Sequence, residues 1–92
     1  MTVLSARITI HISWAASLKD KRQVRRSLTD KARQRFNISI AEVDTQDMHQ
    51  TLTLGLAIVS GERHHAQELM DETVRFIESS TDAEVVSVET ME

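Results

Sequence analysis

Two ten-residue segments with alternating hydrophobicity, residues 3–12 and 51–60, constrain the fold of this chain more than any other feature. In both segments every second side chain is apolar, and most of the side chains between them are polar or small. A period of two places neighbouring side chains on opposite faces of a strand, so each segment predicts a β-strand with one buried face. The inward-facing side chains are expected to be Leu4, Ala6, Ile8, Ile10, Ile12, Leu52, Leu54, Leu56 and Ile58.

A segment with helical spacing follows each of these strands. Residues 17–35 carry a narrow apolar stripe that the stem of Lys21 or Lys31 completes, and Ser17 is placed to cap the first turn. Residues 62–79 carry a wider apolar stripe and an acidic outer face. The apolar positions of the two predicted helices are Leu18, Val24, Leu28, Ala32, Ala66, Leu69, Met70, Thr73, Val74, Phe76 and Ile77.

Two further strands complete the pattern. Residues 37–44 change the phase of their apolar positions, which predicts a β-bulge near residues 40–42 and an antiparallel hairpin with the strand that follows. Residues 83–90 predict a last strand with Val86 and Val88 inward. The order strand, helix, strand, strand, helix, strand predicts an α+β, ferredoxin-like βαββαβ sandwich. Its four-stranded antiparallel sheet has both helices on one face, the first and third strands at the centre, and an open second face.

Length and composition limit the classes of protein to which the chain can belong. With 92 residues, we expect a single ferredoxin-like domain spanning residues 1–92. The chain has no cysteine, so it forms no disulfide and no thiolate metal site. No apolar run approaches the roughly 20 residues that a membrane helix needs. These features are typical of a cytoplasmic protein, and we expect no membrane contact.

Positive charge is concentrated on the first predicted helix. Residues 17–35 hold eight of the eleven Lys and Arg but only two of the fourteen acidic residues, a local charge of +6 in a chain of net charge −3. Like charges crowded on one helix lower its stability unless a partner neutralises them, and the phosphates of RNA are such a partner. The residues expected to contact RNA or a ribosomal particle are Lys19, Lys21, Arg22, Arg25 and Arg26, with Arg33 and Arg35 as weaker members.

Two other interpretations of this helix stay open. A charged helix face is often exposed to solvent and serves only solubility. Alternatively, the helix docks on an acidic protein surface, including that of a second copy. In that case the chain is a protein-interaction or dimerisation module that does not bind nucleic acid.

Three motifs, SLKDKRQVRRSL, RFNISIAEVDTQD and TLGLAIVS, resemble the YlxP-like family of small bacterial proteins of unknown function. The resemblance covers essentially the whole chain. It implies a ferredoxin-like fold, often dimeric, and a gene that frequently lies beside those of translation-initiation and ribosome-maturation factors. The family has no established catalytic activity, so no catalytic residues are implied. This sequence departs from the pattern at Met48 and His49, where relatives often have Leu followed by an aromatic residue.

Neither an enzyme nor a metal site has much support among the residues. The spacing of Glu42, Asp44 and Asp47, with His49 nearby, matches no calcium-binding loop. Strand alternation predicts that Glu42 and Asp44 share one face. We interpret these carboxylates as charges of an edge strand and its turn. The loop of residues 13–17 lacks the arginine that small acylphosphatases of this topology use. We therefore expect no catalytic residues, no metal and no cofactor. Many small-ligand regulatory domains share the topology, but fold alone does not establish that function.

The open face of the predicted sheet has no aromatic side chain on its central strands. The positions there are Arg7, Thr9, His11, Thr53 and Gly55. RNA-recognition modules of this topology stack bases on aromatic residues at such positions, so RNA contact here should reach phosphates through the helix instead. Val3, Ala57 and Val59 share the open face and fit a homodimer contact through it. The only tryptophan, Trp14, is expected to fold over the start of the first helix.

Overall fold

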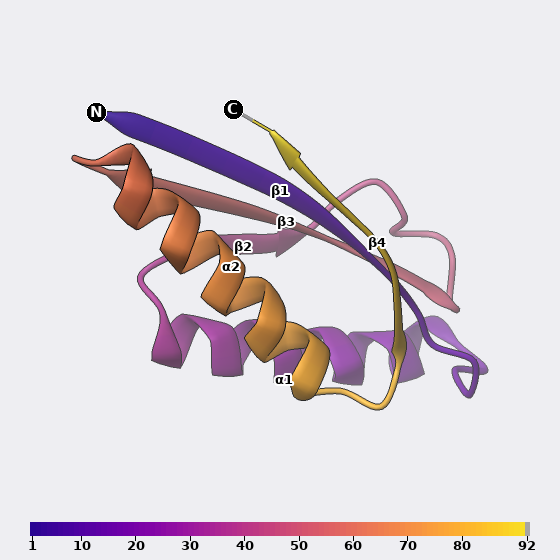
Figure 1. Ribbon diagram of the computed structural model, residues 1–92. Coiled ribbons are helices and arrows are strands. Elements are labelled where there is room, and N and C mark those ends of the chain that lie inside the picture. Colours follow the sequence, from indigo (N-terminus) through magenta and orange to yellow (C-terminus); the bar gives the residue numbers. More distant parts are fainter. Residues whose placement is uncertain (92) are drawn as a thin grey trace.

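The computed structural model describes residues 1–91 and has the predicted βαββαβ order (Figure 1). The sheet order is β2-β3-β1-β4, with every neighbouring pair antiparallel, so β1 and β3 lie at the centre as predicted. Both helices cover the same face of the sheet, which confirms the ferredoxin-like arrangement. The elements are β1 (Thr2–His11), α1 (Leu18–Arg35), β2 (Ser39–Glu42), β3 (Thr51–Ser60), α2 (Arg63–Ser79) and β4 (Glu84–Met91).

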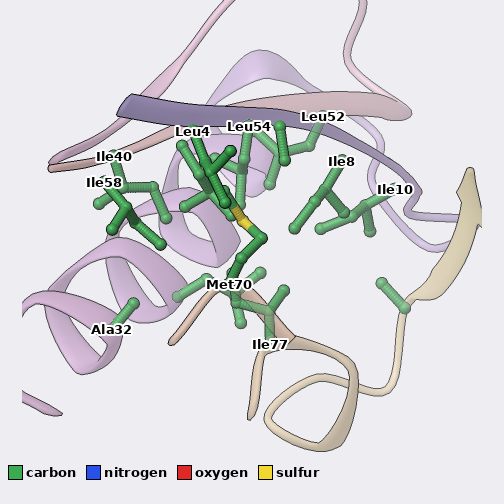
Figure 2. Close-up of a cluster of buried hydrophobic side chains, with 14 of the residues drawn as sticks. Leu4, Ile8, Ile10, Ala32, Ile40, Leu52, Leu54, Ile58, Met70 and Ile77 are labelled. Atoms are coloured by element: carbon green, nitrogen blue, oxygen red, sulfur yellow. The ribbon is translucent and has the colours of Figure 1, made fainter. Parts of the chain in front are cut away.

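The central pair β1–β3 is the longest uninterrupted pairing in the sheet. Its register runs from Thr2 opposite Ser60 to His11 opposite Thr51 without a shift. The alternating apolar side chains of both strands point toward the helices and are almost completely buried, as predicted. Figure 2 shows them converging on Met70 and other side chains of the helix layer. Each buried Leu or Ile contributes about 1.5–3 kcal/mol to the stability relative to an exposed one. The apolar layer between the sheet and the helices therefore dominates the stability of the fold.

Strand β2 is shorter than the predicted strand over residues 37–44, and the expected bulge near residues 40–42 is wrong. β2 pairs with β3 in continuous register, with Glu42 opposite Leu54. The change of phase occurs instead at Asp44, whose φ of 63° is in the left-handed region that Asp tolerates better than most residues. At this turn the side chain of Asp44 points to the face of the sheet opposite that of Glu42. The prediction that Glu42 and Asp44 share one face is therefore also wrong.

The other edge strand, β4, also departs from simple alternation. Its pairing with β1 shifts between Thr9 and Ile10, so that Val85 stands opposite Ile10 and Val86 is the extra residue. Val85 therefore packs against the core, whereas Val86 is half exposed, and its predicted inward position is wrong. Val88 stands opposite the buried Ile8, as predicted, but at the sheet edge it remains 41% exposed. No helix among residues 1–91 is long and apolar enough to cross a membrane.

Helix α1 begins with the predicted N-cap. Ser17 Oγ accepts a hydrogen bond from the Asp20 backbone N–H at 3.2 Å, and Asp20 Oδ2 accepts one from the Ala16 N–H at 2.9 Å. These two contacts satisfy amides at the helix start, and the Asp20 carboxylate also favours the positive end of the helix dipole. The cap thereby fixes where α1 starts.

Replacing Ser17→Ala should destabilise the protein by about 1 kcal/mol because the Asp20 amide loses its acceptor. In a domain of this size that loss lowers the melting temperature by about 4–8 °C, measured by circular dichroism. Ser27→Ala is the matched control, because Ser27 is exposed within α1, where alanine is the better helix former. Equal melting temperatures for S17A and S27A would contradict the assigned cap.

Candidate nucleic-acid interface

The structure buries Lys21, one of the cations predicted to contact RNA. Lys21 is 2% exposed, and its Nζ lies 2.7, 3.2 and 3.3 Å from the backbone oxygens of Thr45, Gln46 and Thr51. It also forms an ion pair with Glu42 Oε2 at 2.8 Å. An ammonium group has only three N–H donors, and the three backbone oxygens occupy them, while the Glu42 carboxylate balances the charge. Lys21 therefore fastens α1 to the β2–β3 loop and cannot reach a phosphate.

Arg25 is held to the same carboxylate. Its Nη1 lies 3.4 Å from Glu42 Oε1, and its side chain is 32% exposed, compared with 9% for Glu42. Glu42 Oε2 has no hydrogen bond of good geometry, so its contact with Lys21 is chiefly an ion pair. Two cations paired with one carboxylate leave a net positive charge at this site. Arg25, the more exposed of the two cations, presents that charge to solvent.

Arg33 and Arg35 are exposed but also make contacts within the protein. Arg33 Nη2 donates to the Ile40 carbonyl oxygen at 2.6 Å, and Arg33 Nη1 lies 3.9 Å from Asp30 Oδ1. Ile40 belongs to the edge strand β2, so this arginine covers a backbone group that would otherwise be open to pairing. The Arg35 guanidinium lies over the rings of Phe36 and Phe76, with its carbon 5.6 and 5.0 Å from their centroids.

Lys19, Arg22 and Arg26 are the predicted cations that remain exposed and unpaired. All three side chains are exposed, and none makes an ion pair with another residue in the range 1–91. Spacings of three and four residues place them on one side of the helix, and Arg33, seven residues beyond Arg26, falls on the same side. We call Lys19, Arg22, Arg26 and Arg33 the basic stripe. The predicted clustering of cations is thus retained by these four residues.

The carboxylates Glu42, Asp44 and Asp47 do not converge on a common site. Glu42 faces the helices and Lys21, whereas Asp44 lies on the open face, with its Oδ2 3.0 Å from Arg7 Nε. Asp47 and His49 are exposed. Within residues 1–91, no three His, Cys, Asp or Glu side chains gather closely enough to hold a metal ion.

Trp14 lies differently from the prediction. It is 53% exposed and borders a shallow concavity with Val24, Ser27 and the loop of residues 80–82, so it covers the helix only partly. Its loop is fixed by Gln50, whose Nε2 donates to the carbonyl oxygens of two residues flanking Trp14, at 3.1 and 3.3 Å.

Sequence reasoning missed two groupings that the structure brings together. One is the buried contact of Lys21 with Glu42; its signal was the position of Lys21 on the apolar stripe, seven residues before Leu28. The other joins Arg35 and Phe36 to Phe76, forty residues further along the chain. No local pattern links those two segments, because only the packing of α2 on α1 brings them together.

Comparison with known structures defines the class of fold. The model resembles two de novo designed proteins: LFR1 1, a ferredoxin-fold design (TM-score 0.61, 14% identity, 99% of this chain and 84% of the design), and Foldit4 (TM-score 0.54, 15% identity, 98% and 94%). At such identities the likeness concerns the fold alone.

Sequence comparison then defines the family. Residues 3–90 match the model of a protein family of unknown function, DUF503. The chain is also 34% identical over 70 residues to the uncharacterized protein YlxP of Bacillus subtilis (strain 168), covering 76% of each chain. The chain belongs to this YlxP-like family, as its motifs indicated.

Replacing the buried Lys21 should lower the stability far more than replacing an exposed lysine of the same helix. Lys21→Met should destabilise the protein by about 3–5 kcal/mol, because it leaves the largely buried Glu42 short of a cation and loop carbonyls without a donor. Lys19→Met, at an exposed position of the same helix, should stay within about 0.5 kcal/mol of the wild type. Urea unfolding followed by circular dichroism measures both. Similar losses in the two variants would refute the structural role assigned to Lys21.

Proposed function

We propose that this protein is a non-catalytic accessory factor of the cytoplasm that binds RNA or a ribosomal particle through the basic stripe. The observation that carries the proposal is the exposure of Lys19, Arg22 and Arg26 on one side of α1 without a neutralising acid among residues 1–91. The rest of the chain, outside residues 17–35, is acidic. A chain selected only for solubility has no need to separate its charges in this way.

The geometry of the stripe fits a phosphate backbone. From Lys19 to Arg33 the helix extends about 21 Å, at about 1.5 Å per residue, so one strand can place several phosphates along it. Arginine can hold a phosphate through two parallel hydrogen bonds, and each neutralised phosphate releases counterions. Arg25, paired with Glu42 and one-third exposed, lies beside the stripe and adds to its potential. Lys21 is not part of this proposal because it is buried.

A homodimer through the open sheet face is the second candidate, and a different observation favours it. Val3 and Val59 stand opposite each other on β1 and β3 and are 48% and 66% exposed. Their neighbours Ala57 and Gly55 are small, so no large side chain projects from this part of the face. A Cβ at Gly55 would lie only 3.2 Å from Val43 Cγ1, so the surface there is closely packed and flat. A flat, apolar sheet surface can pack against the same surface of a second copy of the chain.

The two candidate functions use opposite sides of the molecule and are compatible. The stripe belongs to the helix layer, whereas Val3 and Val59 lie on the uncovered face of the sheet. A sheet-to-sheet dimer would therefore leave both helix layers outside, each with its own basic stripe. If the dimer forms and RNA does not bind, the chain is a dimerisation module.

RNA binding should depend steeply on salt and on the stripe. Arg26→Gln should weaken binding of single-stranded RNA and lower the slope of log affinity against log salt by about 0.7, as expected for one lost phosphate contact. The double variant Arg22→Gln/Arg26→Gln should lower it by about 1.4. Fluorescence anisotropy at several salt concentrations measures the slope, and cosedimentation tests ribosome binding.

Lys31→Gln is the matched control for Arg26→Gln. Lys31 is also exposed on α1, but helical spacing places it on another side from the stripe. It should leave the salt slope unchanged. Equal effects of the two variants, or no binding to RNA and ribosomes at low salt, would overturn the RNA-binding proposal.

The dimer should be sensitive to charge on the open face. Wild-type protein should scatter light at about twice the chain mass of 10.4 kDa, and Val59→Lys should reduce it to the monomer mass because a lysine would be desolvated in the interface. Leu18→Lys is the control, since Leu18 is also exposed, at 40%, but begins α1, on the opposite layer of the molecule. A monomeric wild type would exclude this dimer.

A further inference from the structure

A notch between the C-terminal end of α1 and the last turns of α2 combines aromatic rings with arginines. The rings of Phe36 and Phe76 meet edge to face, with centroids 5.5 Å apart and planes at 78°. The Arg35 guanidinium carbon lies 5.0 Å from the Phe76 centroid and 5.6 Å from that of Phe36. The notch is an open concavity of about 410 Å³. Its lining is completed by Glu72, Arg75 and Ser79.

The two rings position the Arg35 guanidinium before any ligand arrives. A cation held over two aromatic rings is attracted by their quadrupoles and loses freedom of movement. Arg35 remains exposed and lines the notch. Guanidinium planes stack on unpaired bases, and a plane that is already fixed loses less entropy on binding. Arg35 thus supplies on the helix layer the flat surface that the open sheet face lacks.

The other charged groups of the notch complement a nucleotide. Arg75 and Glu72 lie on the same helix, three residues apart, and neither makes an ion pair with another residue of the described chain 1–91. Arg75 can donate to a phosphate, and the Glu72 carboxylate can only accept hydrogen bonds. Among RNA bases, guanine offers two adjacent N–H donors on its Watson–Crick edge, which match a carboxylate. An acidic peptide would use the two arginines but not Glu72.

We infer that this notch binds one unpaired RNA nucleotide, with the base stacked on Arg35, the phosphate on Arg75 and Glu72 favouring guanine. The inference rests on the proposed RNA-binding function and names the base-contacting part of that interface. The notch begins at Arg35, two residues after Arg33, the last member of the basic stripe. Two residues turn the helix by about 200°, so the notch lies on the α2 side of α1 and not in line with the stripe. A single strand held by the stripe would pass around the C-terminal end of α1 to place a base in the notch.

Amide-resolved NMR titration of the intact protein with GMP tests the site. GMP should shift the signals of residues 35, 36 and 76, whereas ribose 5-phosphate, which lacks the base, should shift them at least fivefold less. Arg35→Lys retains the charge but removes the plane and should weaken GMP binding at least fivefold. Glu72→Gln should reduce the preference for GMP over UMP. Glu89→Gln is the control, because Glu89 is exposed and stands opposite Arg7 on the other face of the sheet. The wild-type-like spectrum of each variant shows that it is folded.

The outcomes separate this inference from the function on which it rests. If RNA binds through Arg22 and Arg26 but GMP does not shift the notch, or Arg35→Lys binds GMP as the wild type does, the inference is overturned and the function stands. Equal shifts with ribose 5-phosphate would likewise overturn base stacking. If GMP shifts the notch while RNA is not bound, the RNA-binding function fails and a nucleotide site remains.

Discussion

The buried ammonium group of Lys21 connects the helix that carries the basic stripe to the edge of the sheet. It joins α1 to the carboxylate of Glu42 on β2 and to the backbone of the β2–β3 loop. Because neighbouring helical residues point about 100° apart, a helix with Lys21 inward must turn Arg22 outward. The contact that removes one cation from the surface therefore also orients the basic stripe. A hydrophobic residue at this position would bury as well, but it would leave the loop carbonyls without their donor.

The central strands could be predicted from the sequence almost to the residue, and the reason is physical. In β1 and β3, ten-residue alternation leaves one register that buries the apolar side chains, since a slip of one residue would expose all of them. The edge strands carry a weaker constraint. β2 ends at Glu42, two residues before Asp44 adopts a positive φ, and β4 inserts Val86 as an extra residue. Both deviations depend on tertiary pairing, which local periodicity does not contain.

The candidate interface was predictable as a charged helix but not residue by residue. Composition treats Lys19 and Lys21 alike, although one is exposed and the other 2% exposed. Their difference arises from the acceptors that the β2–β3 loop brings to Lys21, and those acceptors are mainly backbone oxygens. The position of Lys21 on the apolar stripe indicates burial of its stem, but backbone groups have no signature in the sequence, so only the folded chain shows which acceptors hold its ammonium group.

The fold itself contributes little to the functional argument. Its similarity to designed ferredoxin-fold proteins shows that the packing of two helices on four strands is accessible to sequences unrelated to this one. What distinguishes this chain is the placement of charge and aromatic rings on that packing. RNA-recognition modules of the same topology read bases on the sheet face, whereas here the central strands carry no Phe, Tyr or Trp on that face. The guanidinium of Arg35 over two phenylalanines offers the nearest equivalent surface, and it lies on the opposite layer, on the helix that carries the basic stripe. Base and phosphate contacts would then come from one helix layer, which leaves the sheet face free for a second copy of the chain.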